Sequence, residues 1–480
     1  MGMKTLRFRG VLCCIMASAL LFTGLVCGGG LSTLAAVESV NGSDSLVRTS
    51  LTEIKNVLTS ISYTDYLAMY ESSGRPDETV DIDIFGNING DETNITYQVV
   101  DGAEYGKDGK VLLIGDDGKI SFNINIKTAG FYNILVEYYT GNISVYDADG
   151  NLATVGKNAS IERMVMIDGK VPFKEARSIS FSRAWADSYP ELDGDYKVVK
   201  TDGNKTYYDS TSTKFFESVA NGDRIFQRDN NGNEMKPEKT IVGIWYTKRL
   251  FDSSGYSNAP LMFHFENGEH VISLNTVREP FAVKSIKLVP IAETISYEEY
   301  LAEHKNAKDY SGDDIIIQAE YPSLASDRTL YQLNDRTSVI SQPQDSALIR
   351  LNSIGGDKWT YVGQWIEYTF EAPEEGFYYV VPRSIQNVTS GKYVSRKIYI
   401  NGEVPFTEAN YTRFDFSDTW KTDALNDGTT EFKFFLNKGI NTIRLEVALG
   451  DLAGLLSTIE TSLNTCNSYY RKILMITGPD

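Results

Sequence analysis

Few side chains in this sequence are placed for catalysis. The three histidines are His264, His270 and His304, and their spacing matches no His-Glu-x-x-His zinc motif. The sequence also has no Gly-x-Ser-x-Gly elbow, no phosphate-binding loop and no dinucleotide fingerprint. Two carboxylates are enough for a glycosidase, and the chain has 64 Asp and Glu residues. None stands in a recognisable catalytic context, so we expect a protein that is not an enzyme.

One acidic stretch, residues 223–234, has the composition of a calcium-binding loop. An EF-hand ladder started at Asp229 fails, because Glu234 stands where glycine is needed and Thr240 where the closing glutamate should be. The stretch is better interpreted as a solvated loop or an accessory hairpin.

The first 36 residues have the pattern of a secretory signal peptide. Lys4, Arg7 and Arg9 precede an apolar run over residues 11–26, and small residues follow up to Ala36. We expect cleavage near Ala36 and a protein that is secreted or held at the extracellular face of the cell envelope. An uncleaved membrane anchor is the alternative, and the glycine run that follows the apolar segment disfavours it.

Three of the four cysteines, Cys13, Cys14 and Cys27, lie in this leader, so the mature chain would keep only Cys466. A disulfide framework and a cysteine-rich zinc site are therefore excluded. The net charge is −18, which repels phosphate backbones and anionic lipids. We expect no nucleic-acid partner, whereas acidic loops suit Ca²⁺.

Several motifs occur twice, in the same order, at a period much longer than a solenoid repeat. Each pair keeps most of its residues, which indicates two copies of a whole domain. The pairs are 61–68 with 295–302, Gly130–Tyr132 with Gly376–Tyr378, Asp168–Phe173 with Asn401–Phe406, and Phe181–Trp185 with Phe416–Trp420.

Strand-like alternation separated by Asp-Gly and Asn-Gly turns fills both copies, for example at 120–126, 132–139 and 440–447. This spacing predicts antiparallel β-sandwiches. The expected organisation is a signal peptide (1–36), a helical entry segment (37–78), a first sandwich (79–292) with an insertion (186–256), a helical linker (293–312), a second sandwich (313–454) and the start of a further domain (455–480).

The C-terminal segment has a different pattern. Residues 455–470 are compatible with a helix, and 471–477 are interpreted as a buried strand. A lone buried strand needs partners, so it looks like the first strand of an α/β domain in a longer protein. Whether Asp480 is the natural end stays open.

An ordered series of motifs in the second copy resembles the galactose-binding-domain-like β-sandwich of carbohydrate-binding modules, families six and thirty-five in particular. The resemblance covers residues 313–455 well and 80–290 more loosely. It implies a mostly β protein with two jelly-roll sandwiches joined by a short helical linker. The motifs are Ile316–Glu320, Val362–Phe370, Glu374–Tyr379, Ile398–Gly402 and Asn437–Leu445.

In such modules a glutamate of the opening Ala-Glu motif often coordinates a structural Ca²⁺, and Glu320 matches it. Alternatively, Glu320 is an acid at a strand edge, paired to a nearby Lys or Arg. The first copy has Asp81 and Asp83 in its opening strand but no Ala-Glu, which puts a metal site there in doubt.

Sugar recognition in these modules generally uses aromatic faces at the loop end of the sandwich. The resemblance therefore indicates Trp359, Tyr361 and Trp420 as ligand-binding residues. Because the Phe-Ser-x-x-Trp motif is repeated, a core role for Trp185 and Trp420 is the alternative, and Trp359 and Tyr361 are then the exposed pair. Trp365 alternates along a strand and should be buried.

The entry segments and the C-terminal segment also look like the N-terminal part of large Gram-positive extracellular solute-binding proteins of sugar ABC transporters. The resemblance implies a secreted, non-catalytic carbohydrate-binding tandem, in such a transporter or in a polysaccharide-handling surface assembly. A structural cell-surface spacer or adhesin and an accessory region of a glycoside hydrolase are the alternatives. The expected partners are a polysaccharide or oligosaccharide and an ABC transporter permease, and the chain is expected to be a monomer.

Overall fold

The computed structural model describes residues 61–189, 226–227 and 229–478. All of them belong to one compact unit, residues 60–480. The expected signal peptide and the helix expected before residue 60 lie outside the described residues. Strands dominate the described part, which contains three α-helices, so the expected mostly-β class is confirmed. The helices are α4 (Tyr63–Met69), α6 (Tyr297–Glu303) and α7 (Leu452–Thr477).

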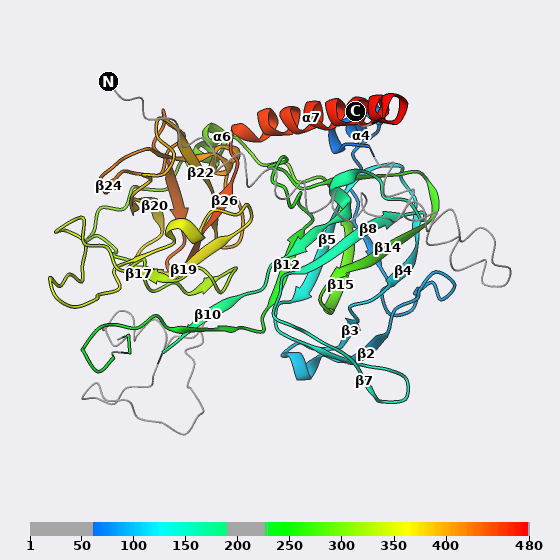
Figure 1. Ribbon diagram of the computed structural model, residues 1–480, viewed down its shortest axis with the longest axis horizontal. Coiled ribbons are helices and arrows are strands. Elements are labelled where there is room, and N and C mark those ends of the chain that lie inside the picture. Colours follow the sequence, from blue (N-terminus) through cyan, green and yellow to red (C-terminus); the bar gives the residue numbers. More distant parts are fainter. Residues whose placement is uncertain (1–60, 190–225, 228, 479–480) are drawn as a thin grey trace. The chain divides into compact units, whose positions relative to one another are not determined.

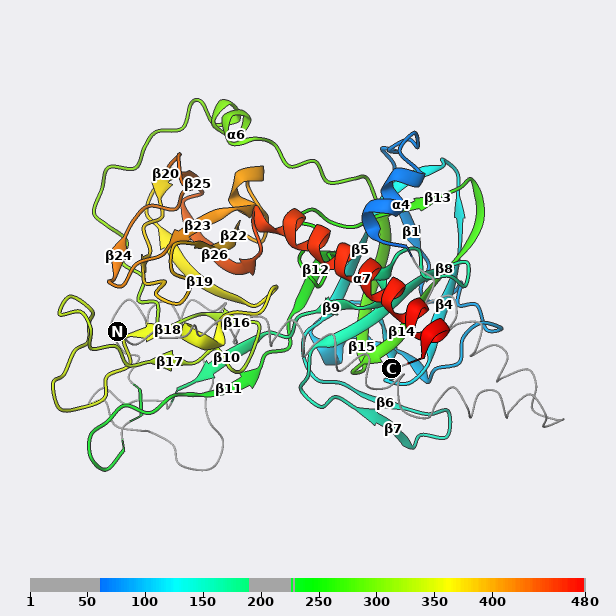
Figure 2. The same cartoon turned by 45° about the horizontal axis from the view of Figure 1, so that its top comes forward.

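The first sandwich consists of two antiparallel sheets (Figure 2). The larger sheet has the order β12-β5-β15-β3-β2; in addition, β1 pairs with β15 and β13 pairs with β5. The smaller sheet has the order β4-β14-β8-β9. Strands β6 and β7 form a separate pair. The strands are β1 (Val80–Ile82), β2 (Tyr97–Asp101), β3 (Lys110–Ile114), β4 (Lys119–Ile126), β5 (Gly130–Tyr139), β6 (Ser144–Tyr146), β7 (Leu152–Val155), β8 (Ile161–Ile167), β9 (Ile179–Phe181), β12 (Trp245–Arg249), β13 (Met262–Phe265), β14 (Gly268–Arg278) and β15 (Phe281–Val289).

Aromatic side chains from both sheets meet in the core of the first sandwich. The ring of Tyr138 on β5 lies 5.2 Å from that of Phe181 on β9, measured between centroids. Phe181 in turn lies 4.7 Å from Phe281 on β15. Apolar side chains at alternate positions of each strand point to this core, which is why the alternating pattern in the sequence identified the strands.

The second sandwich is built on a sheet of order β16-β19-β26-β22-β23, with β10 and β11 added beyond β16 (Figure 1 and Figure 2). Short pairs β20-β25, β21-β24 and β17-β18 complete it. The strands are β10 (Trp185–Ser188), β11 (Glu238–Ile241), β16 (Leu324–Ala325), β17 (Gln332–Leu333), β18 (Ser353–Ile354), β19 (Trp365–Ala372), β20 (Gly376–Tyr379), β21 (Arg383–Ser384), β22 (Tyr393–Ile400), β23 (Thr412–Asp415), β24 (Lys421–Thr422), β25 (Lys433–Leu436) and β26 (Gly439–Ala448).

The core of the second sandwich joins the large sheet to the β20-β25 pair. Ile366, Ile398 and Ile443 of the large sheet belong to the same buried cluster as Phe377 of β20 and Phe434 of β25. The two sequence copies therefore each enclose a core of their own.

The described parts of the insertion expected at 186–256 pair with both sandwiches. β12 pairs with β5 of the first sandwich, whereas β10 meets β16 of the second through Trp185 and Ala325. A buried ion pair fixes this strand, because Lys239 Nζ lies 2.5 Å from Asp187 Oδ1 and both side chains are at most 1% exposed. Gln332 donates a hydrogen bond to the other carboxylate oxygen of Asp187.

Each copy holds its entry helix against an edge strand with two tyrosine hydroxyls. In the first copy, Tyr63 Oη accepts a hydrogen bond from the backbone N–H of Met262 at 2.9 Å. Tyr66 Oη accepts one from the N–H of His264 at 2.8 Å. Both donors lie on β13, so the hydroxyls satisfy N–H groups that an edge strand would otherwise leave open. We call this arrangement the tyrosine clamp.

The second copy repeats the tyrosine clamp. The N–H of Lys433 donates to Tyr297 Oη at 2.8 Å, and the N–H of Phe435 donates to Tyr300 Oη at 2.7 Å. Both donors lie on β25. Phe406 packs against both tyrosine rings, with centroids 4.7 and 5.1 Å away, and it is the phenylalanine of the repeated Val-Pro-Phe turn.

The first residue of each repeated Asp/Asn-Gly turn adopts a left-handed backbone, with φ of 49° at Asp168 and 51° at Asn401. Asp and Asn tolerate this conformation better than other side chains. Their carboxylate or amide oxygens accept N–H bonds from Val271 and Thr442 on the neighbouring strands. The repeated motifs thus have the same structural role in both copies.

The strand predicted at 471–477 is wrong, because α7 continues unbroken to Thr477. Adding one more turn to a helix that already exists costs little, and Leu, Met, Lys and Arg favour helix. Gly478, with φ of 79°, ends the helix. No helix in the described part of the chain is long and apolar enough to cross a membrane.

Candidate functional site

Trp359 lies half-buried against the core of the second sandwich. The Arg396 guanidinium covers its ring, with Cζ 4.4 Å from the centroid. The indole N–H donates to the backbone oxygen of Gln364 at 3.2 Å. The Arg396 guanidinium therefore covers part of this ring, which reduces the area open to a stacked ligand.

Tyr361, two residues further on, is 73% exposed. Its backbone N–H and that of Thr360 donate to the side-chain oxygen of Gln364. The loop is thus held in place while the phenol ring is presented to solvent. The structure gives Tyr361 the exposure that stacking on a ligand requires.

Trp420 is half-buried rather than part of the core. Its indole N–H donates to Asp335 Oδ1 at 3.0 Å, and the Arg383 guanidinium lies 5.9 Å from the ring centroid. Arg383 is itself held by Ser338, with 2.6 Å between Nη2 and Oγ. An aromatic ring, a carboxylate and a guanidinium are therefore fixed together here, a combination that suits a polar ligand with apolar faces.

Two further tryptophans, Trp365 and Trp185, differ from Trp420. Trp365 is 2% exposed, which confirms its expected burial, and Trp185 is 7% exposed. Arg444 Cζ lies 4.0 Å from the Trp365 ring centroid. The repeated Phe-Ser-x-x-Trp motif therefore places its tryptophan differently in the two copies.

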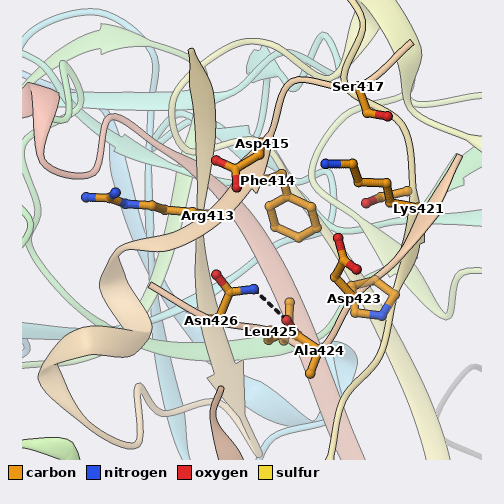
Figure 3. Close-up of a pocket in the computed structure, with 11 residues that line it drawn as sticks. Arg413, Phe414, Asp415, Ser417, Lys421, Asp423, Ala424, Leu425 and Asn426 are labelled. Atoms are coloured by element: carbon orange, nitrogen blue, oxygen red, sulfur yellow. Dashed lines mark hydrogen bonds between the residues drawn. The ribbon is translucent and has the colours of Figure 1, made fainter. Parts of the chain in front are cut away.

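A small pocket lies between β23 and β24 (Figure 3), and its lining includes Lys421, the residue that follows Trp420, but not Trp420 itself. Figure 3 shows the Phe414 ring in the middle of the pocket, with Asp415, Lys421 and Asp423 around it. Its cavity volume is about 30 Å³, which is room for a water molecule or two. A ligand larger than a few atoms would therefore lie across the opening, not inside it. The lining residues are Pro382, Ser384, Arg413, Phe414, Asp415, Ser417, Lys421 and Asp423–Asn426.

The charges around this pocket are of both signs. Arg413 forms an ion pair with Asp451 and lies over the ring of Tyr393, with Cζ 4.2 Å from the centroid. The hydrogen bond to Asp451 raises the pKa of Arg413. Lys421 and Asp423 are exposed and remain accessible to a ligand that has hydroxyl groups.

Glu320 lies outside any strand and is 2% exposed. Burial raises the pKa of its carboxyl group to about 7, and the nearby Glu234 adds to the shift. Among the described residues no Lys or Arg forms an ion pair with Glu320, whereas Glu234 lies 3.6 Å from Arg350. Nor do those residues contain a group of three or more His, Cys, Asp or Glu side chains that could hold a metal. Calcium at Glu320 stays a prediction.

The sequence reasoning missed Asp335, Arg383 and the pocket residues between Arg413 and Asn426. Asp335 and Arg383 are far from Trp420 in the sequence, and only the fold brings the three together. One signal was available: Trp420 is followed by Lys421, whereas Trp185 is followed by Ala186.

No family model and no curated protein matches this chain. Solved structures do match it at low identity. A family 35 carbohydrate-binding module from Clostridium thermocellum is 11% identical, with 44% of this chain and 97% of the module covered and a TM-score of 0.20. The tandem CBM51 modules of a family 98 glycoside hydrolase from Streptococcus pneumoniae are 11% identical, with 78% and 95% covered and a TM-score of 0.16.

The catalytic domain of a GH87 alpha-1,3-glucanase in complex with nigerose is also similar, at 10% identity and a TM-score of 0.23. The match covers 51% of this chain but only 38% of the glucanase. At such TM-scores none of these likenesses bears on function, which has to be inferred from the chain's own residues.

Proposed function

We propose that the second sandwich binds carbohydrate without catalysis, at the surface formed by Trp420 and the adjoining pocket. The observation that supports this most is the fixed Trp420 ring beside Asp335, Arg383 and a mixed-charge pocket. A pyranose has apolar C–H faces and a rim of hydroxyl groups, and this surface offers a matching partner for each.

The hydroxyl groups of the sugar would bond to the side chains around the pocket. Asp415 and Asp423 accept hydrogen bonds, Lys421 donates them, and Asn426 does both. Because Asp335 and Arg383 already hold the Trp420 ring, little side-chain freedom is lost on binding. The surface is shallow and polar, so we expect dissociation constants on the order of micromolar to millimolar.

The wider setting is also part of the proposal. The protein is secreted or held at the outer face of a Gram-positive cell envelope. It supplies sugars to an ABC transporter permease as part of a solute-binding protein, or holds polysaccharide in a surface assembly. A structural Ca²⁺ at Glu320 would replace a buried proton with a metal, since hard cations take carboxylate oxygens as ligands.

The test is isothermal titration calorimetry of the mature chain, residues 37–480, against a panel of soluble polysaccharides with and without Ca²⁺. Trp420→Ala and Asp423→Ala should each weaken binding roughly five- to thirty-fold, because a stacked ring or a bonded carboxylate contributes about 1–2 kcal/mol. Circular dichroism of each variant reports whether the fold is kept.

Tyr361→Ala is the matched comparison, since Tyr361 is exposed but stands apart from this pocket. If Tyr361→Ala abolishes binding while Trp420→Ala and Asp423→Ala leave it unchanged, the ligand uses the Tyr361 loop and the proposed surface is wrong. If no polysaccharide binds to the unaltered protein, the role of a cell-surface spacer is the better proposal.

A further inference from the structure

The C-terminal helix α7 (red in Figure 1) exposes a row of large apolar side chains. Helices of globular proteins normally bury such a row against a core, yet the only buried residue of this helix is Ala453. The exposed fractions are Leu452 37%, Leu455 57%, Ile459 45%, Leu463 55%, Tyr469 61%, Tyr470 60%, Ile473 55% and Ile476 85%.

A different face of α7 contacts the rest of the protein. Ala453 is buried, and one heptad further on Glu460 Oε2 lies 3.4 Å from Lys174 Nζ of the first sandwich. Leu456, three residues after Ala453 and four before Glu460, is half-buried, so the contact borders one side of the apolar row. The large apolar side chains at the other positions of the row are exposed within the part of the chain that the structure describes.

The apolar row repeats every seven residues. Leu452, Ile459, Cys466 and Ile473 occupy one series, and Leu455, Tyr469 and Ile476 with Ser462 occupy the series three residues later. These correspond to the a and d positions of a coiled coil. Leu456, Leu463 and Tyr470 widen the row on its e side. At 1.5 Å per residue, the 26-residue helix is about 39 Å long, which gives nearly four heptads.

The charges on α7 decide between the possible occupants. A helix that binds anionic lipid has Lys and Arg along its polar face. Here the charged residues of the helix are Glu460, Arg471 and Lys472, on a chain with a net charge of −18, so a lipid surface is disfavoured. The a, d and e positions contain no charged residue at all. Two identical copies of the row can therefore meet without any contact between like charges.

We propose that two copies of this chain associate through their α7 helices as a parallel coiled coil, with the two Cys466 side chains facing each other near its middle. The interface is isologous, because the same row serves both partners. Such a dimer would replace the monomer expected from the sequence. It would also present two copies of the Trp420 surface, which raises the avidity for a polymer with repeated sugar units.

The first test measures the mass of the mature chain by size-exclusion chromatography with light scattering, under reducing conditions. We expect a dimer. Leu463→Glu places a charge in the row of both partners and should raise the dissociation constant of the dimer roughly ten-fold or more. Asn464→Glu adds the same charge outside the row and should leave the dimer intact. A monomer at every concentration tested would overturn the proposal.

The second test determines the orientation by disulfide crosslinking with oxidised glutathione, which is reduced as each disulfide forms. Cys466 in the unaltered chain should crosslink. In a Cys466→Ser background, a cysteine introduced by Ile459→Cys or Ile473→Cys should crosslink as well, since every a position meets its own copy in a parallel pair. Asn467→Cys in the same background is the control and should not.

Crosslinking of Cys466 without that of the Ile459→Cys and Ile473→Cys variants would show an antiparallel pair and overturn the parallel arrangement. If Asn467→Cys crosslinked as much as the Ile459→Cys and Ile473→Cys variants, the disulfides would arise from random encounters of two chains and not from a defined interface. This result too would overturn the proposal. Sedimentation with phosphatidylserine vesicles while the chain is monomeric would assign the row to lipid instead.

Discussion

The two sandwiches attach their entry helices in the same way but differ within the Phe-Ser-x-x-Trp motif. In the first, Arg183 of this motif is 1% exposed, and its guanidinium lies 3.0 Å from Glu279 and donates to the carbonyl oxygens of Ala159 and Thr140. In the second, Asp418 takes its place and is exposed. The same motif position is therefore buried in the first copy and exposed in the second.

A second difference concerns an aromatic pair at the end of the tyrosine clamp. In the first copy, His264 of β13 stacks on Tyr70 after the entry helix, with centroids 4.0 Å apart. In the second, His304 after the entry helix stacks on Phe435 of β25 at 4.2 Å. Both copies therefore have the stacked pair, but the histidine is on the strand in the first copy and after the helix in the second. The geometry of the stack does not depend on which of the two residues is the histidine.

The largest effect should come from the phenylalanine of the repeated turn. Phe173→Ala and Phe406→Ala each remove a ring that is 0% exposed, which costs about 3–5 kcal/mol. Because the two rings contact the clamp tyrosines in the same way, the two losses should be similar. Urea unfolding followed by circular dichroism measures both. A difference of more than about 2 kcal/mol between the two variants would break the structural equivalence of the copies.

The next prediction concerns the buried ion pair between Arg183 and Glu279. Arg183 belongs to the Phe-Ser-x-x-Trp motif of the first copy, and the second copy has Asp418 there. Glu279→Ala leaves the Arg183 guanidinium buried without its counter-charge, and we expect a loss of about 3–5 kcal/mol in the free energy of unfolding. Asp418 stands at the motif position that Arg183 has in the first copy. Asp418→Ala should change the free energy of unfolding by less than about 0.5 kcal/mol. Equal effects in the same urea experiment would contradict the difference between the copies.

The tyrosine hydroxyls should matter less. Tyr66→Phe and Tyr300→Phe each remove the acceptor for one backbone N–H, and we expect each to lower the free energy of unfolding by about 1 kcal/mol. Tyr361→Phe is the control, because that ring is exposed. Thermal unfolding compares the three variants, and a loss in Tyr361→Phe equal to that in the clamp variants would argue against the clamp.

The smallest effect concerns pH. Burial lowers the pKa of His264, against an opposing contribution from Glu266. The unfolded chain therefore binds a proton here more readily than the folded chain. The contribution of neutral His264 to the free energy of unfolding is fully present above the ordinary histidine pKa of about 6.5, and it is lost as the pH falls below that value. His264→Phe, which copies Phe435 of the second sandwich, should reduce this loss as the pH is lowered from neutrality to about 5.

The matched exchange in the second copy, His304→Tyr, copies Tyr70 and serves as the control. Urea titrations at several pH values give the slope for each variant. An unchanged slope in His264→Phe would show that the acid sensitivity arises elsewhere.

Much of this architecture could be predicted from the sequence. The repeated motifs identified the two copies, and alternation located most of the strands, because a sandwich strand has one face in the core and one in water. Burial of Trp365 was deduced from the same alternation. These predictions depend on patterns that are local to each strand.

The misses have two causes, an ambiguous local pattern and contacts between distant segments. The continuation of α7 through 471–477 was missed, because a short apolar run has no periodicity of its own and can belong to either element. Exposure of Trp420 could not be deduced from a motif that buries Trp185. The joining of Trp420 to Asp335 and Arg383 depends on loops that only the folded chain brings together. The signal peptide, calcium and the ligand stay predictions.

The added strands β10 and β11 limit how the chain can be divided. Because Trp185 pairs with Ala325 and Lys239 is locked to Asp187, the sheet of the second copy is finished by residues that precede it in the sequence. A fragment that starts at residue 313 would expose the open edge of β16, and it would tend to aggregate. The second copy therefore depends on residues that come before it in the sequence, and a cut at residue 313 would not release it as an intact module.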